Sequence, residues 1–306
     1  MPPLVIQTEH LDPAAAAWLA ERCRLEYCPS EDPRFAGLLP QADALLIRTY
    51  TQVNEALLSK ATKLRAVARA GVGLDNVDQE ACKKRGIAVL STPGANTRAV
   101  VEYVFALIAD ALRPRVYLDR PLDAGPWKQA RADLIASRQL SDLTLGILGL
   151  GRVGSGVARV GVAMDMRVLY NDLLEFPPER RFGATPVSFD ELVQRSDILT
   201  LHPDGRASNR HLLSAAALAR CKADVLIINT SRGFIVDSEA LAGFLRERPR
   251  AMAMLDVHDP EPFGPDYPLL DLPNCRLAPH LAAATRTAHA NMSWVVRDLW
   301  DVLSGA

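Results

Sequence analysis

The hydrophobic positions of the chain fall into short β-rich runs that alternate with segments of helical pattern. In the first third these runs read LVIQT, ALLIR, AVARA and IAVL, and further on they read LTLGILGL, RVLYN, DILTL, VLIIN, AMAML and CRLA. Regular alternation of strands and helices is typical of parallel sheets joined by crossover helices. The pattern therefore predicts an α/β fold with parallel sheets.

Polar residues at capping positions mark where three helices begin. Thr97 precedes RAVVEYVFALI, and Asp237 precedes SEALAGFL. Ser188 is followed three residues later by Glu191, which is the spacing of a capping box. Because such side chains accept hydrogen bonds from the free amides of a first helical turn, they predict helices that start directly after Thr97, Ser188 and Asp237.

The segment from Arg113 to Asp142 interrupts the alternation. It shows little periodicity and contains several residues that break regular structure, namely Pro114, Pro121, Gly125 and Pro126. We interpret it as an arm or linker between a first α/β set and a second set that starts at Leu143. A length of 306 residues is enough for two compact domains, each with its own core.

Composition and charge narrow the classes of partner. The 35 lysines and arginines nearly balance the 36 aspartates and glutamates, so we expect no nucleic-acid or membrane partner. The amino terminus lacks the basic and apolar regions of a signal peptide, and the five cysteines form no CxxC pair. We expect a cytoplasmic protein with reduced thiols, whose partner is a small molecule.

A glycine-rich motif follows the first strand of the second set. Gly149-x-Gly151-x-x-Gly154 comes directly after an apolar run and at the opening of a helical pattern. Gly149 permits the tight turn, Gly151 allows the backbone to reach a pyrophosphate, and Gly154 allows close packing of helix on strand. Backbone amides near Arg152 and Val153 would meet the phosphates at the positive end of the helix. The motif predicts a dinucleotide-binding site.

An acidic residue at the end of the next β-rich run favours NAD over NADP. Asp172 lies eighteen residues after Gly154. Its carboxylate would accept hydrogen bonds from the adenosine ribose hydroxyls, and its charge would repel the additional phosphate of NADP. We therefore expect NAD as the cofactor.

Three polar residues that suit hydride transfer to a 2-oxo acid follow the ends of later strands. They are Arg232 in NTSRG, Glu261 in LDVHDPEP and His280 in APHLAAAT. The reaction needs a proton donor, a cation that holds the carboxylate and polarises the carbonyl, and a group that tunes the pKa of the donor. The neighbouring His258 and Asp259 lack the spacing of known metal sites, so we expect no metal.

Several separated motifs in this order resemble the D-isomer-specific 2-hydroxyacid dehydrogenase family, and within it most of all the phosphoglycerate dehydrogenases. They read ARAGVGLDNVD, TPGANTRAVVEY, GLGRVG, NTSRG, DVHDPEP and PHLAAAT. The resemblance extends from about Leu45 to His280. It implies two Rossmann-like domains: a discontinuous, flavodoxin-like substrate domain of residues 1–98 and 281–306, and an NAD-binding domain of residues 99–280.

The resemblance also implies roles for particular residues. His280 would be the general acid and base, Glu261 its partner, and Arg232 the ligand of the substrate carboxylate and carbonyl. Other substrate contacts would come from the first α/β set, namely Arg48, Val72, Gly73 and Asn96. Other cofactor contacts would come from His202, Thr230 and Asp256, the last two on the nicotinamide side.

Two departures from the family pattern affect the cofactor site. Asp204 stands where the family usually has the proline of His-x-Pro, so the loop near the adenosine is expected to differ. Ala282 and Ala283 stand where glycine is common, so an additional methyl group is expected near the nicotinamide.

The sequence leaves the substrate and two alternatives open. Arg48 is either a ligand for a phosphate or second carboxylate or a surface arginine. The resemblance implies a small D-2-hydroxy or 2-oxo acid as substrate. It would be of the phosphoglycerate type, the glycerate or hydroxypyruvate type, or the glyoxylate type. One alternative is a dinucleotide-sensing, corepressor-like binding protein without turnover. The other is a related dehydrogenase that acts on formate or phosphonate, of which the formate branch is disfavoured because those enzymes carry glutamine in place of Glu261. We expect a homodimer and, since the chain ends at Ala306, no appended regulatory domain.

Overall fold

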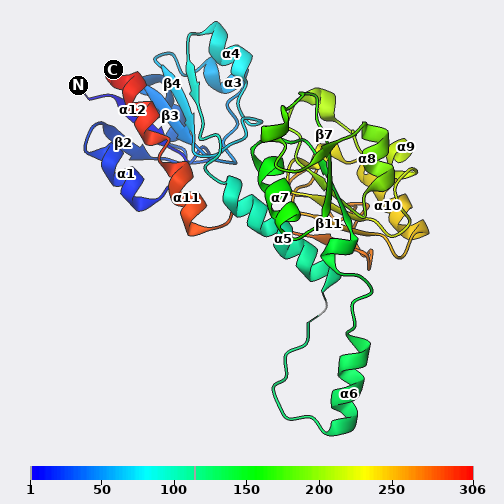
Figure 1. Ribbon diagram of the computed structural model, residues 1–306. Coiled ribbons are helices and arrows are strands. Elements are labelled where there is room, and N and C mark those ends of the chain that lie inside the picture. The colour runs from blue at the N-terminus through cyan, green and yellow to red at the C-terminus, as the bar shows by residue number, and fades with distance from the viewer. Residues whose placement is uncertain (1, 114, 306) are drawn as a thin grey trace. The chain divides into compact units, whose positions relative to one another are not determined.

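The computed structural model describes residues 2–113 and 115–305, and the chain divides into two compact units (Figure 1). The first unit comprises Met1–Ala99 and Ala283–Ala306, and the second comprises Val100–Ala282. Each unit has its own parallel sheet and its own core.

The first unit is built on a parallel sheet that, within the described residues, has five strands in the order β2-β1-β3-β4-β5. The strands are β1 (Leu4–Gln7), β2 (Arg24–Tyr27), β3 (Ala44–Ile47), β4 (Ala66–Arg69) and β5 (Ala88–Leu90). All residues of β1 and β3 are buried, which explains why β3 and the first three residues of β1 are apolar. The strand order is that of flavodoxin-like folds.

Helices from both ends of the chain cover this sheet. They are α1 (Pro13–Ala20), α2 (Phe35–Leu38), α3 (Glu55–Leu58), α4 (Gln79–Lys84), α11 (Arg286–Ser293) and α12 (Val296–Ser304). Leu299 and Leu303 of α12 belong to the same buried cluster as Ala66 and Ala68 of β4. The carboxy-terminal segment therefore completes the core of the first unit.

The second unit is built on a parallel sheet that, among the residues described, has seven strands in the order β12-β11-β10-β9-β6-β7-β8. The strands are β6 (Thr144–Leu148), β7 (Arg167–Asn171), β8 (Thr185–Pro186), β9 (Ile198–Leu201), β10 (Leu226–Asn229), β11 (Met252–Leu255) and β12 (Cys275–Leu277). This is the dinucleotide-binding order with one additional strand, and the order reverses between β6 and β9. Ligands of such sheets bind where the order reverses, beyond the carboxyl ends of the strands.

Helices pack on both faces of the second sheet. They are α5 (Thr97–Leu112), α7 (Arg152–Ala163), α8 (Phe189–Arg195), α9 (Ala215–Leu218) and α10 (Ser238–Glu247). Ile108 of α5 and Val157 of α7 share one buried cluster, and Leu192 of α8 and Leu245 of α10 share another. The two units together confirm the predicted fold class.

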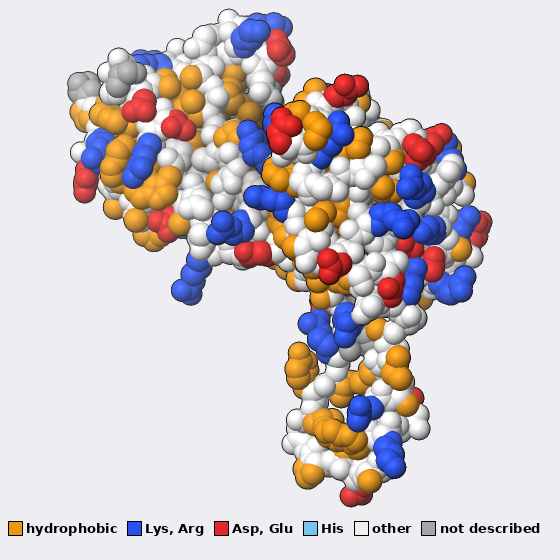
Figure 2. Space-filling view, viewed as in Figure 1, with side chains coloured by type: hydrophobic (Ala, Val, Ile, Leu, Met, Phe, Trp, Pro, Cys, Tyr) orange, Lys and Arg blue, Asp and Glu red, His pale blue; other side chains and the backbone are white. Residues whose placement is uncertain are grey.

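Ten predicted β-rich runs all contain strands, whereas several short elements and one longer helix were not predicted individually. Among them are the short strands β2 and β8 and the helix α6 (Ala124–Asp133). The helix lies in the segment interpreted as an arm or linker, and none of its residues is buried. In Figure 1 this segment projects away from the sheet of its unit, and Figure 2 shows hydrophobic side chains on it. Its proline at position 114 lies outside the described residues.

The predicted helix starts agree with the structure to within one residue. Ser188 caps α8 in a capping box with Glu191, and the side chain of Asp237 accepts from the Ala240 amide at the start of α10. Helix α5 begins at Thr97 itself, one residue earlier than predicted. Within the described part of the chain, no helix combines the length and apolar character needed to span a bilayer.

Candidate active site

The glycine-rich loop connects β6 to α7 at the carboxyl edge of the second sheet. Gly149 has a φ of +90°, and a Cβ there would lie 2.9 Å from the backbone of His202. A Cβ on Gly154 would lie 2.0 Å from the Gly149 carbonyl oxygen, whereas one on Gly151 would project into open space. Gly149 and Gly154 thus permit close packing, and Gly151 leaves the backbone accessible.

The loop and the adjacent strands fit the binding of NAD. The first amides of α7 have no acceptor within the helix, and they lie at the positive end of the helix dipole, which suits a pyrophosphate. The loop after β10 carries a buried hydroxyl, Thr230 Oγ1, that has no hydrogen-bond partner among the described residues. An amide-bearing ligand such as nicotinamide could satisfy this group.

Asp172 lies directly after β7 and is fixed against the glycine loop. Its Oδ2 accepts the amide of Leu150 at 2.6 Å, and its Oδ1 accepts the amide of Leu174 at 2.9 Å. The carboxylate predicted to bind the ribose is therefore held beside the loop predicted to bind the phosphates.

The loop after β9 lies on the other side of the glycine loop. The His202 amide donates to the Leu148 carbonyl at 2.7 Å, and the His202 ring shares a hydrogen bond of 2.8 Å with the Thr200 hydroxyl. Burial lowers the pKa of His202 to about 3, so its ring is neutral at pH 7. Further along, Asp204 pairs with Arg206 through two hydrogen bonds of 2.7 and 2.5 Å.

The three candidate catalytic residues follow neighbouring strands. Arg232 follows β10, Glu261 follows β11, and His280 follows β12. The His280 Nδ1 lies 2.9 Å from the Glu261 Oε2. This hydrogen bond raises the pKa of His280, burial opposes the rise, and the charge of Arg232 also lowers it. Although burial favours the neutral acid, the hydrogen bond from His280 keeps the pKa of Glu261 below its usual value. The sequence-predicted pair is therefore in direct contact.

Asp256 holds the turn that carries His280. The Asp256 carbonyl accepts the His280 amide at 2.9 Å, and its carboxylate oxygens accept the amides of Leu281 at 2.7 Å and Ala282 at 2.8 Å. These bonds hold His280 in the left-handed region, with a φ of +57°. Asp256 is 0% exposed, and burial raises its pKa. The sequence did not predict this contact, and the predicted contact of Asp256 with the nicotinamide side stays a prediction.

The backbone around Arg232 packs against the loop after β11. A Cβ on Gly233 would lie 1.9 Å from the His258 carbonyl carbon, so only glycine fits there. The Arg232 Nη1 donates to the Ser231 carbonyl at 2.7 Å. His258 donates from Nε2 to the Ala278 carbonyl at 2.9 Å and packs edge-on against Phe263. His258 thus connects two loops of the site as a packed residue.

The remaining predicted substrate residues lie in the first unit, near the carboxyl ends of β3 and β4. Arg48 follows β3, while Val72 and Gly73 follow β4. All three residues are half-buried. Asn96, also half-buried, directly precedes α5.

Three residues that the sequence did not single out, Glu9, His10 and His289, contact Arg48 or its loop. The carboxylate of Glu9 accepts the four consecutive amides of Arg48, Thr49, Tyr50 and Thr51, at 2.8 to 3.3 Å. The Arg48 guanidinium contacts His289 of α11 and donates to the His10 carbonyl at 3.4 Å. Burial lowers the pKa of Arg48. Arg48 is therefore partly buried and held in place, and its role as a substrate ligand stays a prediction.

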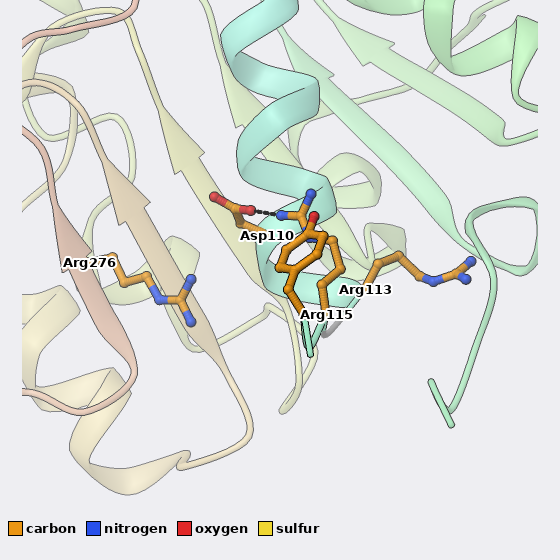
Figure 3. A pocket seen from close by; sticks show the side chains of 5 residues that line it. Asp110, Arg113, Arg115 and Arg276 are labelled. Atoms are coloured by element: carbon orange, nitrogen blue, oxygen red, sulfur yellow. Dashed lines mark hydrogen bonds and ion pairs between the residues drawn. The ribbon is translucent and has the colours of Figure 1, made fainter. Parts of the chain in front are cut away.

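An open hollow of about 550 Å³ in the second unit contains none of the predicted site residues. Its lining consists of Asp110, Arg113, Arg115, Tyr117 and Arg276. In Figure 3, Asp110 points toward Arg115 and pairs with it, while Arg113 points away from Arg276. The arginines do not converge on one point, so the hollow is no part of the candidate site.

Comparisons with known proteins agree with this geometry. The family model for the D-isomer specific 2-hydroxyacid dehydrogenase NAD binding domain matches residues 105–282. A glyoxylate reductase of Aeropyrum pernix is 37% identical, with 97% of this chain and 91% of that protein covered. An (S)-sulfolactate dehydrogenase of Chromohalobacter salexigens is 36% identical, with 96% of each covered.

A D-3-phosphoglycerate dehydrogenase of Archaeoglobus fulgidus is 35% identical over 85% of this chain, which spans about half of that protein (49%). Among solved structures, the D-lactate dehydrogenase of Aquifex aeolicus complexed with NAD and lactic acid has a TM-score of 0.85 at 26% identity, with 99% of this chain and 96% of that chain covered. These relatives are enzymes, which supports the enzyme prediction over the corepressor-like alternative. The chain therefore belongs to the D-isomer-specific 2-hydroxyacid dehydrogenase family and is an NAD-linked oxidoreductase of 2-hydroxy and 2-oxo acids.

Proposed function

We propose that this enzyme interconverts a small 2-oxo acid and its D-2-hydroxy acid, with His280 as the general acid and base. The observation that carries the proposal is the 2.9 Å contact between His280 Nδ1 and Glu261, on neighbouring loops that also include Arg232. Because Nδ1 is engaged by Glu261, Nε2 is the atom that gives a proton to the substrate oxygen. NADH supplies the hydride when bound.

Arg232 would bind the substrate carboxylate and polarise the carbonyl. Its planar guanidinium can donate two parallel hydrogen bonds to a carboxylate, and its charge stabilises the alkoxide that develops on reduction. Glu261 keeps His280 protonated before reduction, because a carboxylate beside an imidazole favours the charged ring.

Residues of the second unit would make the cofactor contacts. The backbone from Gly149 through Gly151, Arg152 and Val153 to Gly154 would hold the pyrophosphate, and Asp172 would hold the adenosine ribose. His202 would border the adenosine side, and Thr230 and Asp256 the nicotinamide side. The orphaned Thr230 hydroxyl supports this assignment.

The first unit would act as the substrate domain. Amides at Val72 and Gly73 would hold the substrate carboxylate, and Asn96 would border the substrate. Arg48 would meet a second acidic group of the substrate, which its fixed position beside His289 supports. The candidate substrates include the acids in the names of relatives, which refer to glyoxylate, phosphoglycerate and sulfolactate. A homodimer and a cytoplasmic location stay predictions.

The experiment is to follow NADH oxidation with a panel of 2-oxo acids. The panel comprises glyoxylate, hydroxypyruvate, hydroxypyruvate 3-phosphate, sulfopyruvate, pyruvate and 2-oxoglutarate. We expect turnover with at least one acid and almost none in the His280→Ala variant, which should still bind NADH. Absence of turnover by the wild type with every acid would overturn the proposal.

A further inference from the structure

The loop after β9 carries an ion pair that none of the roles above uses. The guanidinium of Arg206 donates two hydrogen bonds to the carboxylate of Asp204, from Nε at 2.7 Å and from Nη2 at 2.5 Å. Asn209 also donates to Asp204 Oδ1 at 3.1 Å, and the Arg206 amide does so at 3.3 Å. The pair is half exposed, with side-chain exposures of 54% and 56%. The arginine is therefore held by a carboxylate yet accessible to a ligand.

Neighbouring contacts place the segment that leads into this pair against the glycine loop of the candidate cofactor site. The glycine loop contacts the β9 loop closely, since a Cβ on Gly149 would lie 3.0 Å from the Pro203 nitrogen. The same glycine loop holds Asp172 through the Leu150 amide. The β9 loop is fixed on its other side by the Ser231 hydroxyl, which donates to the Pro203 carbonyl at 2.5 Å. Asp204 and Arg206 thus follow a segment that is fixed between the two ends of the candidate cofactor site.

Electrostatics agree with this placement. The pKa of Arg206 is raised first by its hydrogen bond to Asp204 and by the charge of Asp204, and then by the charge of Asp172. Asp172 is the residue to which we assign the ribose hydroxyls, next to the position where NADP carries its additional phosphate. The charge of Asp172 therefore acts on Arg206.

We propose that Asp204 and Arg206 form a second determinant of cofactor choice, in which Arg206 is a latent ligand for the 2′-phosphate of NADP and Asp204 keeps it engaged. This inference rests on the proposed role of Asp172. Two carboxylates then act against NADP: Asp172 by direct repulsion of the phosphate, and Asp204 by occupying the guanidinium that would bind it. An arginine released from Asp204 has the bidentate geometry that phosphate recognition needs.

The test measures binding of NAD⁺ and NADP⁺ by isothermal titration calorimetry without substrate, so that its readout does not depend on turnover. The proteins are the wild type, Asp172→Ala, Asp204→Ala, the double variant, and the triple variant that also carries Arg206→Ala. We expect the double variant to bind NADP⁺ at least about tenfold more tightly than the wild type, and by more than the product of the two single effects. In the triple variant the gain in NADP⁺ affinity should fall back to that of Asp172→Ala alone, while NAD⁺ affinity stays within about twofold of that of the double variant.

A control makes the same change of net charge at the opposite edge of the same sheet. Asp224 lies two residues before β10 and contacts Arg138 at 3.4 Å, whereas Asp197 is the closer partner of Arg138 at 2.9 Å, and Asp224→Ala changes the net charge as Asp204→Ala does. This variant should leave NADP⁺ affinity unchanged in both backgrounds. Because Asp172 also caps two backbone amides, Asp172→Asn provides a second background that removes the charge and retains an acceptor.

The outcomes separate this inference from the proposed function. Equal NADP⁺ affinity in the double and triple variants, with NAD⁺ still bound, would overturn the role of Arg206 alone. An equal gain from Asp224→Ala would show a general charge effect and would likewise overturn it. A wild-type chain that binds neither cofactor would overturn both the inference and the proposed function.

Discussion

The proposed role of Arg232 in substrate binding depends on the shape of its side chain as much as on its charge. Arg232→Lys keeps the positive charge but removes the planar fork that suits a carboxylate, so we expect kcat/KM for the best 2-oxo acid to fall about 100-fold. Steady-state kinetics measures this loss. Arg220→Lys is the matched control, because Arg220 pairs with Asp190 at 3.1 Å outside the site and should retain wild-type kinetics. Wild-type kinetics in Arg232→Lys would remove the residue from the substrate site.

The pKa of His280 links Glu261 to the pH profile. Reduction needs protonated His280, and the hydrogen bond to Glu261 raises the pKa of that ring. In Glu261→Gln the pKa should fall, so the alkaline limb of the kcat/KM profile for reduction should move to lower pH. Oxidation needs neutral His280, so its acidic limb should move in the same direction. Limbs that stay in place, or that move in opposite directions, would contradict the assignment of Glu261.

At the scale of the element, two glycines of the β6–α7 turn have different roles, since Gly154 serves packing and Gly151 would serve cofactor binding. A Cβ on Gly154 would meet the Gly149 carbonyl at 2.0 Å, so Gly154→Ala must displace backbone and should cost about 1–3 kcal/mol of unfolding free energy. A Cβ on Gly151 would meet open space, so Gly151→Ala should keep the wild-type Tm. Its methyl group would nevertheless occupy the approach to the pyrophosphate, and NAD⁺ affinity should fall.

Thermal denaturation and titration of NAD⁺ on the same preparations check both variants. The informative result is the crossed pattern, with Tm lowered in Gly154→Ala and affinity lowered at constant Tm in Gly151→Ala. If Gly151→Ala bound NAD⁺ as the wild type does, the loop would not carry the phosphates.

For the whole molecule, the segment around α6 is the surface that we expect a second copy to cover. Tyr117 and Ile135 are 86% and 78% exposed, and Val116, Leu118 and Trp127 are exposed as well. Apolar side chains gathered on a projecting segment are typical of interaction surfaces. Sedimentation of the wild type should give twice the chain mass of 33.4 kDa, and the double variant Tyr117→Ser with Ile135→Ser should weaken the dimer. A wild type that sediments as a monomer would contradict this prediction.

Much of the fold and part of the site are determined by local sequence. The β-rich runs predict ten strands, most clearly the central ones, because burial on both faces makes strands such as β3, β6 and β10 apolar along most of their length. The glycine motif with Asp172 identifies the cofactor loop because a tight turn, an exposed backbone and a close helix each require glycine. Arg232, Glu261 and His280 could be grouped in advance because parallel strands place their carboxyl ends on one edge.

Only the tertiary structure decided the contacts between residues that are distant in sequence, because these contacts follow no local pattern. The carboxylate of Glu9 caps the loop of Arg48, that of Asp256 holds the turn of His280, and that of Asp172 accepts the amide of Leu150 in the glycine loop. Strand order belongs to the same class, as do β2 and β8, whose short runs become strands through their neighbours. Buried backbone amides need an acceptor, and the chain supplies whichever carboxylate the fold brings near, so these partners are selected by packing rather than by periodicity.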